Sequence, residues 1–160
     1  MITKNGAIIF AHRLYETSVQ SGNGLKKIDG TTVTNNYSTM LGTARSNIFE
    51  TTSANTGVVM NIGSGSAAES ADDYCLAQPL TANDYQCSVP GASPVSVTAT
   101  SDGNMIYTFT FYAVTDCTIN EIGLFALNNS GKVLLARKVI PARQVTAGET
   151  FTFSYVVKFN

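Results

Sequence analysis

The sequence predicts an all-β fold, an antiparallel β-sandwich of the jelly-roll or Ig-like type with an extended N-terminal arm. Apolar and polar residues alternate between Met105 and Phe159, and turn residues break the chain into short runs. Together these two observations predict the sandwich. The arm is predicted because few large apolar residues occur before position 57. We therefore divide the 160 residues into an N-terminal arm, 1–56, and a β-sandwich domain, 57–160.

At least six runs after position 56 have the length and composition of strands. The first is a continuous apolar run typical of a buried strand, and the later runs alternate as half-buried strands do. Asn128 to Gly131 is a tight-turn sequence, because Asn and Gly tolerate positive φ angles. The six predicted strands cover residues 57–62, 95–100, 105–112, 121–127, 132–140 and 151–159.

The alternation also predicts which side chains fill the core between the two sheets. Two apolar faces bury large side chains only by facing each other, about 10 Å apart. Strict alternation places Arg137 on the same face as Val133 and Leu135. An arginine there either reaches the sheet margin or pairs with a carboxylate, for which Glu121 and Glu149 are candidates. The predicted core residues are Phe109, Phe111, Phe125, Leu135, Phe153 and Tyr155.

Residues 1–56 contain one apolar segment, Ala7 to Leu14, which is too short to distinguish a strand from a helical turn. Ordering a residue costs ~1–2 kcal/mol in backbone entropy, and the arm has few apolar side chains to compensate. We expect it to order against a neighbouring subunit; a mobile surface loop is the alternative. The side chains expected to anchor it there are Ile8, Ile9, Phe10, Leu14 and Tyr15.

Composition restricts the partners of the chain. Charged residues make up 13% of it, well below the roughly 25% of ordinary soluble domains, and the formal net charge is −1. We expect no binding to nucleic acid or to a membrane, because a near-neutral chain has no electrostatic attraction for either. A surface poor in charge suits a subunit packed against others and an ordinary β-sandwich equally.

The expected compartment is a cytoplasm. No apolar run approaches the ~20 residues that span a bilayer, and the N-terminal apolar segment is too short for a signal peptide. Cys75, Cys87 and Cys117 are odd in number and contain no Cys-x-x-Cys pair. This pattern predicts reduced thiols rather than disulfides or structural zinc.

Three features resemble ligand-binding or catalytic motifs, and each has a simpler structural explanation. Residues 63–68 match G-x-G-x-x-A after a strand, but a nucleotide site needs a strand-helix-strand unit and the downstream pattern is hairpins. Glu69, Asp72 and Asp73 lack the alternating oxygen ligands of a calcium loop. His12 is the only histidine and has no carboxylate near it in sequence. We expect no metal and no cofactor.

Six short segments after position 57 form a series of strands and turns. They are Met60–Gly65, Asp72–Leu76, Glu121–Phe125, Leu134–Arg137, Val145–Glu149 and Phe151–Phe159. This series resembles a pattern found in structural proteins of tailed-bacteriophage virions. The resemblance covers residues 57–160 and consists of strands and turns rather than a catalytic signature.

The resemblance implies a non-enzymatic virion structural protein, a capsid-decoration, neck or tail subunit that acts through protein–protein assembly. Its partners would be other virion subunits, with homo-oligomer formation, and it would be assembled in the cytoplasm of the host bacterium. A second hypothesis is a carbohydrate- or receptor-binding β-sandwich module on a phage fibre, with a host-surface glycan as partner. A third, an enzyme, is disfavoured by the single histidine and the lack of a convergent acid–base pair.

Overall fold

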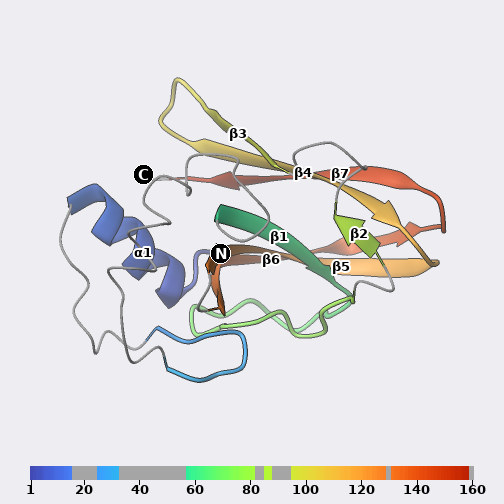
Figure 1. Cartoon of the computed structure of the whole chain (residues 1–160), viewed down its shortest axis with the longest axis horizontal. Helices are drawn as coiled ribbons and strands as arrows, with labels where there is room; N and C mark the ends of the chain where they lie inside the picture. The colour runs from blue at the N-terminus through green and yellow to red at the C-terminus, as the bar shows by residue number, and fades with distance from the viewer. Residues whose placement is uncertain (16–24, 33–56, 82–84, 88–94, 129–130, 159–160) are drawn as a thin grey trace.

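The structure is a computed structural model that describes residues 1–15, 25–32, 57–81, 85–87, 95–128 and 131–158. One helix and seven strands lie in these residues and are labelled in Figure 1. In chain order they are α1 (Lys4–Tyr15), β1 (Gly57–Gly63), β2 (Tyr85–Cys87), β3 (Val95–Ala99), β4 (Met105–Ala113), β5 (Cys117–Asn128), β6 (Gly131–Val145) and β7 (Thr150–Val157).

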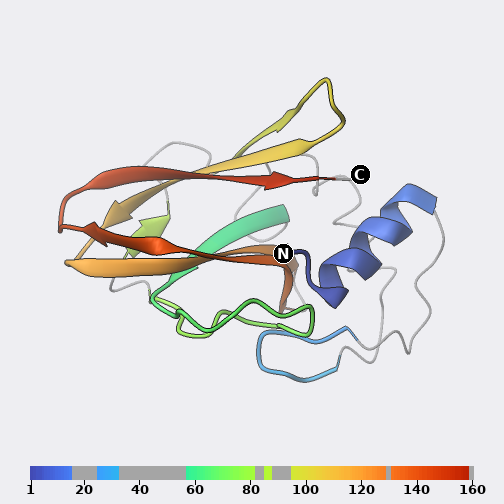
Figure 2. The ribbon, with the colours of Figure 1, turned by 180° about the vertical axis from the view of Figure 1, so that it is seen from behind.

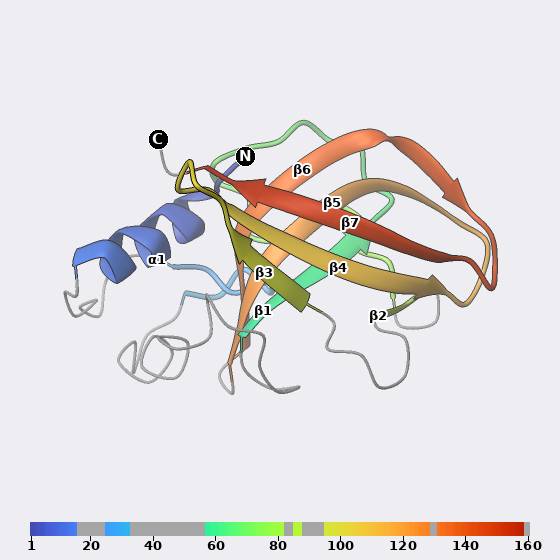
Figure 3. The ribbon, with the colours of Figure 1, turned by 90° about the horizontal axis from the view of Figure 1, so that it is seen from above.

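The strands form two antiparallel sheets, which confirms the prediction of an all-β fold. In the first sheet β5 lies between β1 and β6. In the second sheet β4 is central: β7 pairs along one edge of it, and the short strands β2 and β3 share the other edge. Figures 1 and 3 show the sheets as two layers, one with β3, β4 and β7 and the other with β1, β5 and β6.

Large side chains from both sheets form one main hydrophobic core. Phe109 and Phe111 of β4 and Leu135 of β6 are fully buried in it, and Tyr155 of β7 is buried beside them. The structure therefore confirms these four predictions. Phe153 is only partly buried and packs at the margin of the same core. Alternation predicted the inward faces of β4 and β7 correctly because these two strands pair in a continuous register, without a bulge.

Phe125 does not belong to the main core, contrary to the sequence-based expectation. It packs with Leu76 and Leu134 in a separate small cluster. Adjacent strand residues point to opposite faces of a sheet, and Leu124 takes the position that faces the main core. Because both residues are large and apolar, their order along the strand did not show which would face inward.

A β-bulge in β6 overturns the expected orientation of Arg137. Leu124 of β5 pairs with Ala136 and the next residue, Phe125, pairs with Leu134, so Leu135 is an extra residue in β6. Leu135 and Ala136 both contact the main core as a result. Arg137 then points to the opposite face of the sheet, not to the face of Leu135.

That opposite face is covered by residues 64–80, which we call the covering segment. Most of it has no regular secondary structure. Its ends are joined to each other and to β1: the Ser64 N–H donates to the Gln78 carbonyl at 2.9 Å, and the Leu80 N–H donates to the Ile62 carbonyl at 3.0 Å. Figures 1 and 2 show the segment on the side of the first sheet that faces away from β4 and β7.

The N-terminal residues pack against the edge of β6. Ile2 forms a bridge with Ala136, and the Thr3 N–H donates to the Leu135 carbonyl at 3.0 Å. Helix α1 follows, and Ile9 on it is only 3% exposed and belongs to the main core. Figure 2 shows α1 beside the end of the two layers, next to the start of the chain.

The expectation of an extended N-terminal arm is therefore wrong for the described part of residues 1–56. Residues 4–15 are helical, and Leu25, in the second described stretch, is also buried in the main core. The chain's own first sheet supplies the apolar contact that the arm was expected to lack. Residues 16–24 and 33–56 lie outside the described residues, so the boundary after residue 56 stays a prediction.

Phe111→Ala should lower the free energy of unfolding by ~3–5 kcal/mol, because it removes a fully buried ring that stacks on Phe151 at 5.5 Å. Tyr112→Ala is the matched control: the neighbouring aromatic residue is 39% exposed, and its loss should cost no more than about 1 kcal/mol. Urea unfolding of both variants measures the difference. Equal losses would contradict the assignment of the inward face of β4.

Candidate functional site

The most elaborate polar site in the described residues is built around Glu121 of β5. Its side chain is completely buried. One carboxylate oxygen accepts hydrogen bonds from the N–H groups of Gly65 at 3.2 Å and Gln78 at 2.8 Å. The other accepts from the Ala77 N–H at 3.1 Å and from Nε of Arg137 at 2.7 Å. Glu121 thus binds three backbone groups of the covering segment and one side chain of β6.

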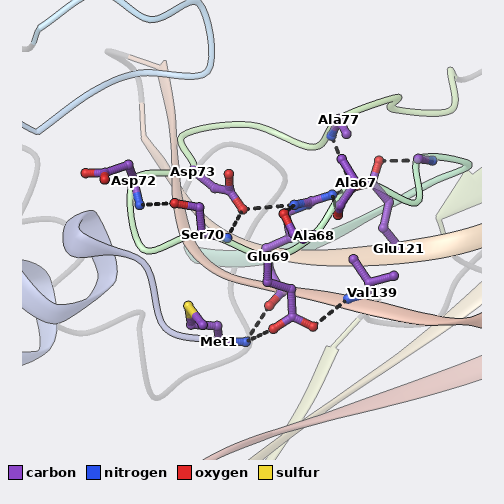
Figure 4. A network of polar contacts seen from close by, with 12 residues as sticks. Met1, Ala67, Ala68, Glu69, Ser70, Asp72, Asp73, Ala77, Glu121 and Val139 are labelled. Atoms are coloured by element: carbon purple, nitrogen blue, oxygen red, sulfur yellow. Dashed lines mark hydrogen bonds and ion pairs between the residues drawn. The ribbon is translucent and has the colours of Figure 1, made fainter.

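Arg137 is the cation of the same site and is 2% exposed. Its Nη1 donates to a carboxylate oxygen of Asp73 at 2.9 Å and to the Ala68 carbonyl at 3.2 Å, and its Nη2 donates to the Ala67 carbonyl at 2.9 Å. Figure 4 shows Asp73, Ala67, Ala68 and Glu121, the four residues that bind the guanidinium, close together in the site. We call Glu121, Arg137 and Asp73 the polar clamp, because they fasten the covering segment to the sheet.

Two glycines allow the covering segment to approach the sheet this closely. A Cβ atom on Gly65 would lie 2.5 Å from the Glu121 carboxylate, and one on Gly123 would lie 2.7 Å from the Leu76 side chain. Both distances are too short for any larger residue without displacement of the segment. Leu76 fills the space above Gly123 and contacts Phe125, so a small apolar cluster lies directly beside the polar clamp.

Glu69 forms a second, outer link between the covering segment and the first sheet. Its carboxylate accepts from the Val139 N–H at 2.9 Å and from the amino group of Met1 at 3.0 Å, and pairs with Lys138 Nζ at 3.2 Å. Burial raises the pKa of Glu69, but the bonds from Val139, Met1 and Lys138 outweigh it and hold the pKa at about 2. Figure 4 shows the carboxylate between Met1 and Val139.

The Arg137 guanidinium is a fixed charge at the centre of the polar clamp. Burial lowers the pKa of Arg137, but hydrogen bonds from its guanidinium to Glu121 and Asp73 raise it above the usual arginine value. Burial and the charges of Asp73 and Glu121 raise the pKa of the nearby Cys75 thiol. Cys75 therefore stays protonated, and the arginine stays charged.

The nucleotide-like motif at residues 63–68 belongs to this site, with a different role. Residues 64–70 after β1 are not helical, so the segment lacks the helix N-terminus that a dinucleotide site needs. The Gly65 N–H donates to Glu121 rather than facing an open cradle. The motif therefore marks the start of the covering segment.

The carboxylates that suggested calcium are separated by their partners. Glu69 binds backbone and cationic groups near β6, Asp72 forms an ion pair with Lys4 of α1, and Asp73 binds Arg137. Within the ranges that the structure describes, no three His, Cys, Asp or Glu side chains gather as a metal-binding group. His12 lies in α1, and its side chain is outside the described residues.

The proposed anchor residues are tested only in part. Ile9 is buried in the main core of its own chain, and Ile8 is partly buried against that core. The side chains of Phe10, Leu14 and Tyr15 lie outside the described residues, so the anchor stays a prediction.

Sequence reasoning named the pair at the centre of the clamp but not its surroundings. Glu121 was one of two candidate partners for Arg137, and the structure confirms it; Glu149 pairs with Arg143 instead. The role of Asp73 was missed. The sequence did offer one signal for it. Asp73 is an acidic residue in Asp72–Leu76, and this segment carries the resemblance together with the strands that contain Glu121 and Arg137.

Comparison with known proteins found no matching family model, no matching curated protein and no matching solved structure. In the described residues, no helix combines the length and the apolar character needed to cross a bilayer.

Glu121→Gln should lower the free energy of unfolding by ~3–5 kcal/mol, because it leaves the buried Arg137 charge without its nearest partner. The control is Glu149→Gln, which breaks the partly exposed pair with Arg143 and should cost no more than about 1 kcal/mol. Chemical denaturation of both variants compares them. A loss for Glu121→Gln as small as that of the control would show that the clamp contributes little.

Glu69→Gln should lower stability by about 1–2 kcal/mol at pH 7, allowing for partial solvent screening of this side chain. The pKa of Glu69 is depressed in the folded state, so its contribution is present above about pH 5 and is lost as the pH falls toward 2. The difference between wild type and variant should shrink over this interval in denaturation experiments. A difference that stays constant down to pH 3 would contradict the assignment.

Proposed function

We propose that this chain is a non-enzymatic structural subunit of a tailed-bacteriophage particle, acting through protein–protein assembly as a capsid-decoration, neck or tail protein. In this proposal the two sheets are the layers of a β-sandwich of the jelly-roll or Ig-like type. The subunit is assembled in the host bacterial cytoplasm and carried in the virion.

The observation that supports the proposal most is the convergence of four of the six segments that carry the resemblance. Met60–Gly65 and Asp72–Leu76 meet Glu121–Phe125 and Leu134–Arg137 at the polar clamp and its apolar cluster. In this proposal the shared pattern is a structural device that closes the covering segment onto the first sheet.

The use of the charged groups in this device also favours a structural role. Both side chains are buried, and their polar atoms bind each other and the backbone of the covering segment. Such groups supply fixed attraction in a medium of low polarity. They hold loops in place and are poorly placed to meet a substrate from solution.

The outer face of the second sheet is suited to contact with other subunits. β4 and β7 contain no charged residue. Thr108 pairs with Ser154 at 3.0 Å and Thr110 with Thr152 at 3.3 Å, so hydroxyl groups cover the middle of this face. Tyr112 and Val156 are exposed beyond them. An uncharged surface of this kind can be buried without the cost of desolvating ions.

The direct test is the protein content of purified tailed particles from a lysate in which the gene is expressed. The proposal predicts peptides of this chain in gradient-purified particles, in amounts comparable with those of known structural subunits. Antibody labelling then shows whether the chain lies on the head, neck or tail. Particles that lack the chain while the lysate contains it would contradict the proposal, and binding of the free chain to host-surface glycan would then favour the fibre module.

A further inference from the structure

The two edges of the first sheet are covered by other parts of the chain. An edge strand presents unpaired N–H and C=O groups that invite pairing with another strand. Along β6, the backbone of residues 1–3 bonds to Leu135 and Arg137, and the Glu69 carboxylate accepts from the Val139 N–H. The edge strand β1 is joined to the covering segment at its C-terminal end. The first sheet is therefore protected along at least part of each edge.

The second sheet has one long edge without such protection. β7 has eight residues, Thr150–Val157, whereas β2 and β3 on the opposite edge have only three and five. Short edge strands, prolines and charged side chains are the usual protections, and β7 has none of them. β4 occupies one edge of β7, and no backbone group among the described residues pairs with the other.

We propose that the free edge of β7 pairs antiparallel with β7 of a second copy of this chain, about a two-fold axis at Phe153. The second sheets of the two copies then form one continuous sheet. This inference rests on the proposed function, because it names the partner and the surface of one assembly contact. It identifies backbone pairing, rather than a side-chain pocket, as the source of that contact.

The hydroxyl groups on the outer face determine the expected register. Opposed residues in an antiparallel pair share a face, so a register that preserves both faces pairs even-numbered with even-numbered positions. With the axis at Phe153, Thr152 lies opposite Ser154 of the second copy, and Phe151 lies opposite Tyr155. The hydroxyl pairs already formed by Thr152 and Ser154 with β4 are then continued across the new contact.

The absence of charge on β7 favours a second copy over a different partner. A two-fold contact places each surface against itself, so any charged residue near the axis would meet a like charge. β7 has no Asp, Glu, Lys or Arg, and its exposed residues near the axis are hydroxyl-bearing. One charge from β6 does lie close to the axis, because the Arg143 guanidinium is 5.2 Å from the Phe151 ring and 5.6 Å from the Phe153 ring. Glu149 pairs with Arg143 at 3.1 Å, so this charge is neutralised within its own copy and offers a foreign strand little by which it could be selected.

Sedimentation equilibrium of the full chain over a range of concentrations tests the proposal with three variants. Thr152→Lys/Ser154→Lys places like charges opposite each other twice per dimer and should weaken association roughly tenfold or more. Thr152→Lys/Ser154→Glu places opposite charges across the same two positions and should restore it. Thr108→Lys/Thr110→Lys adds the same charge to the same face of the central strand and should leave edge pairing nearly unchanged.

Each result either supports or overturns the proposal. A monomeric wild-type chain at all concentrations overturns it, and so does an equal weakening by the Lys/Lys and Lys/Glu variants of β7. Weakening by the β4 variant as large as that by the β7 Lys/Lys variant would show stacking of sheet faces instead of edge pairing. Thermal midpoints close to that of wild type confirm that each variant is folded.

The particle experiment tests the proposed function, and the sedimentation experiment tests the edge contact, so a negative result in each contradicts a different proposal. A chain that is present in tailed particles but monomeric in solution overturns the edge contact and leaves the proposed function standing. A chain that dimerises through β7 but is absent from particles overturns the proposed function alone.

Discussion

The buried ion pair between Glu121 and Arg137 is the interaction on which the arrangement of the first sheet and its covering segment depends. The two residues come from neighbouring strands, and each also binds the covering segment, through backbone N–H groups at Glu121 and backbone carbonyls at Arg137. Neither charge could remain buried without the other, because removing an ion from water costs several kcal/mol. The segment, in turn, has little secondary structure of its own and takes its position from these bonds.

The strands and most of the main core could be predicted from the sequence because period-two alternation directly reflects the geometry of a pleated sheet. Phe109 and Phe111 were placed correctly for this reason. The prediction failed where the period changes: the extra residue Leu135 reverses the orientation of Arg137, and no residue type in this stretch marks a bulge. One of the two carboxylates considered as a partner for Arg137, Glu121, is nevertheless the one that binds it.

Contacts between distant segments were the part that the sequence could not show. Helix α1 contains few strong helix signals, and Ile9 is buried only because β6 offers a surface to it. The same holds for Gly65 and Asp73, whose roles follow from their position over Glu121 and Arg137 rather than from their neighbours in the chain.

Native-state hydrogen exchange of the Gly65, Ala77 and Gln78 amides is the most direct test of the central role of the clamp. These N–H groups lie outside the strands and donate to the Glu121 carboxylate. If the clamp fastens the covering segment as firmly as the sheet is held, all three should exchange as slowly as the amides of β5, through global unfolding. Exchange at the rate of an exposed loop would show that the segment opens independently and that the ion pair does not hold it.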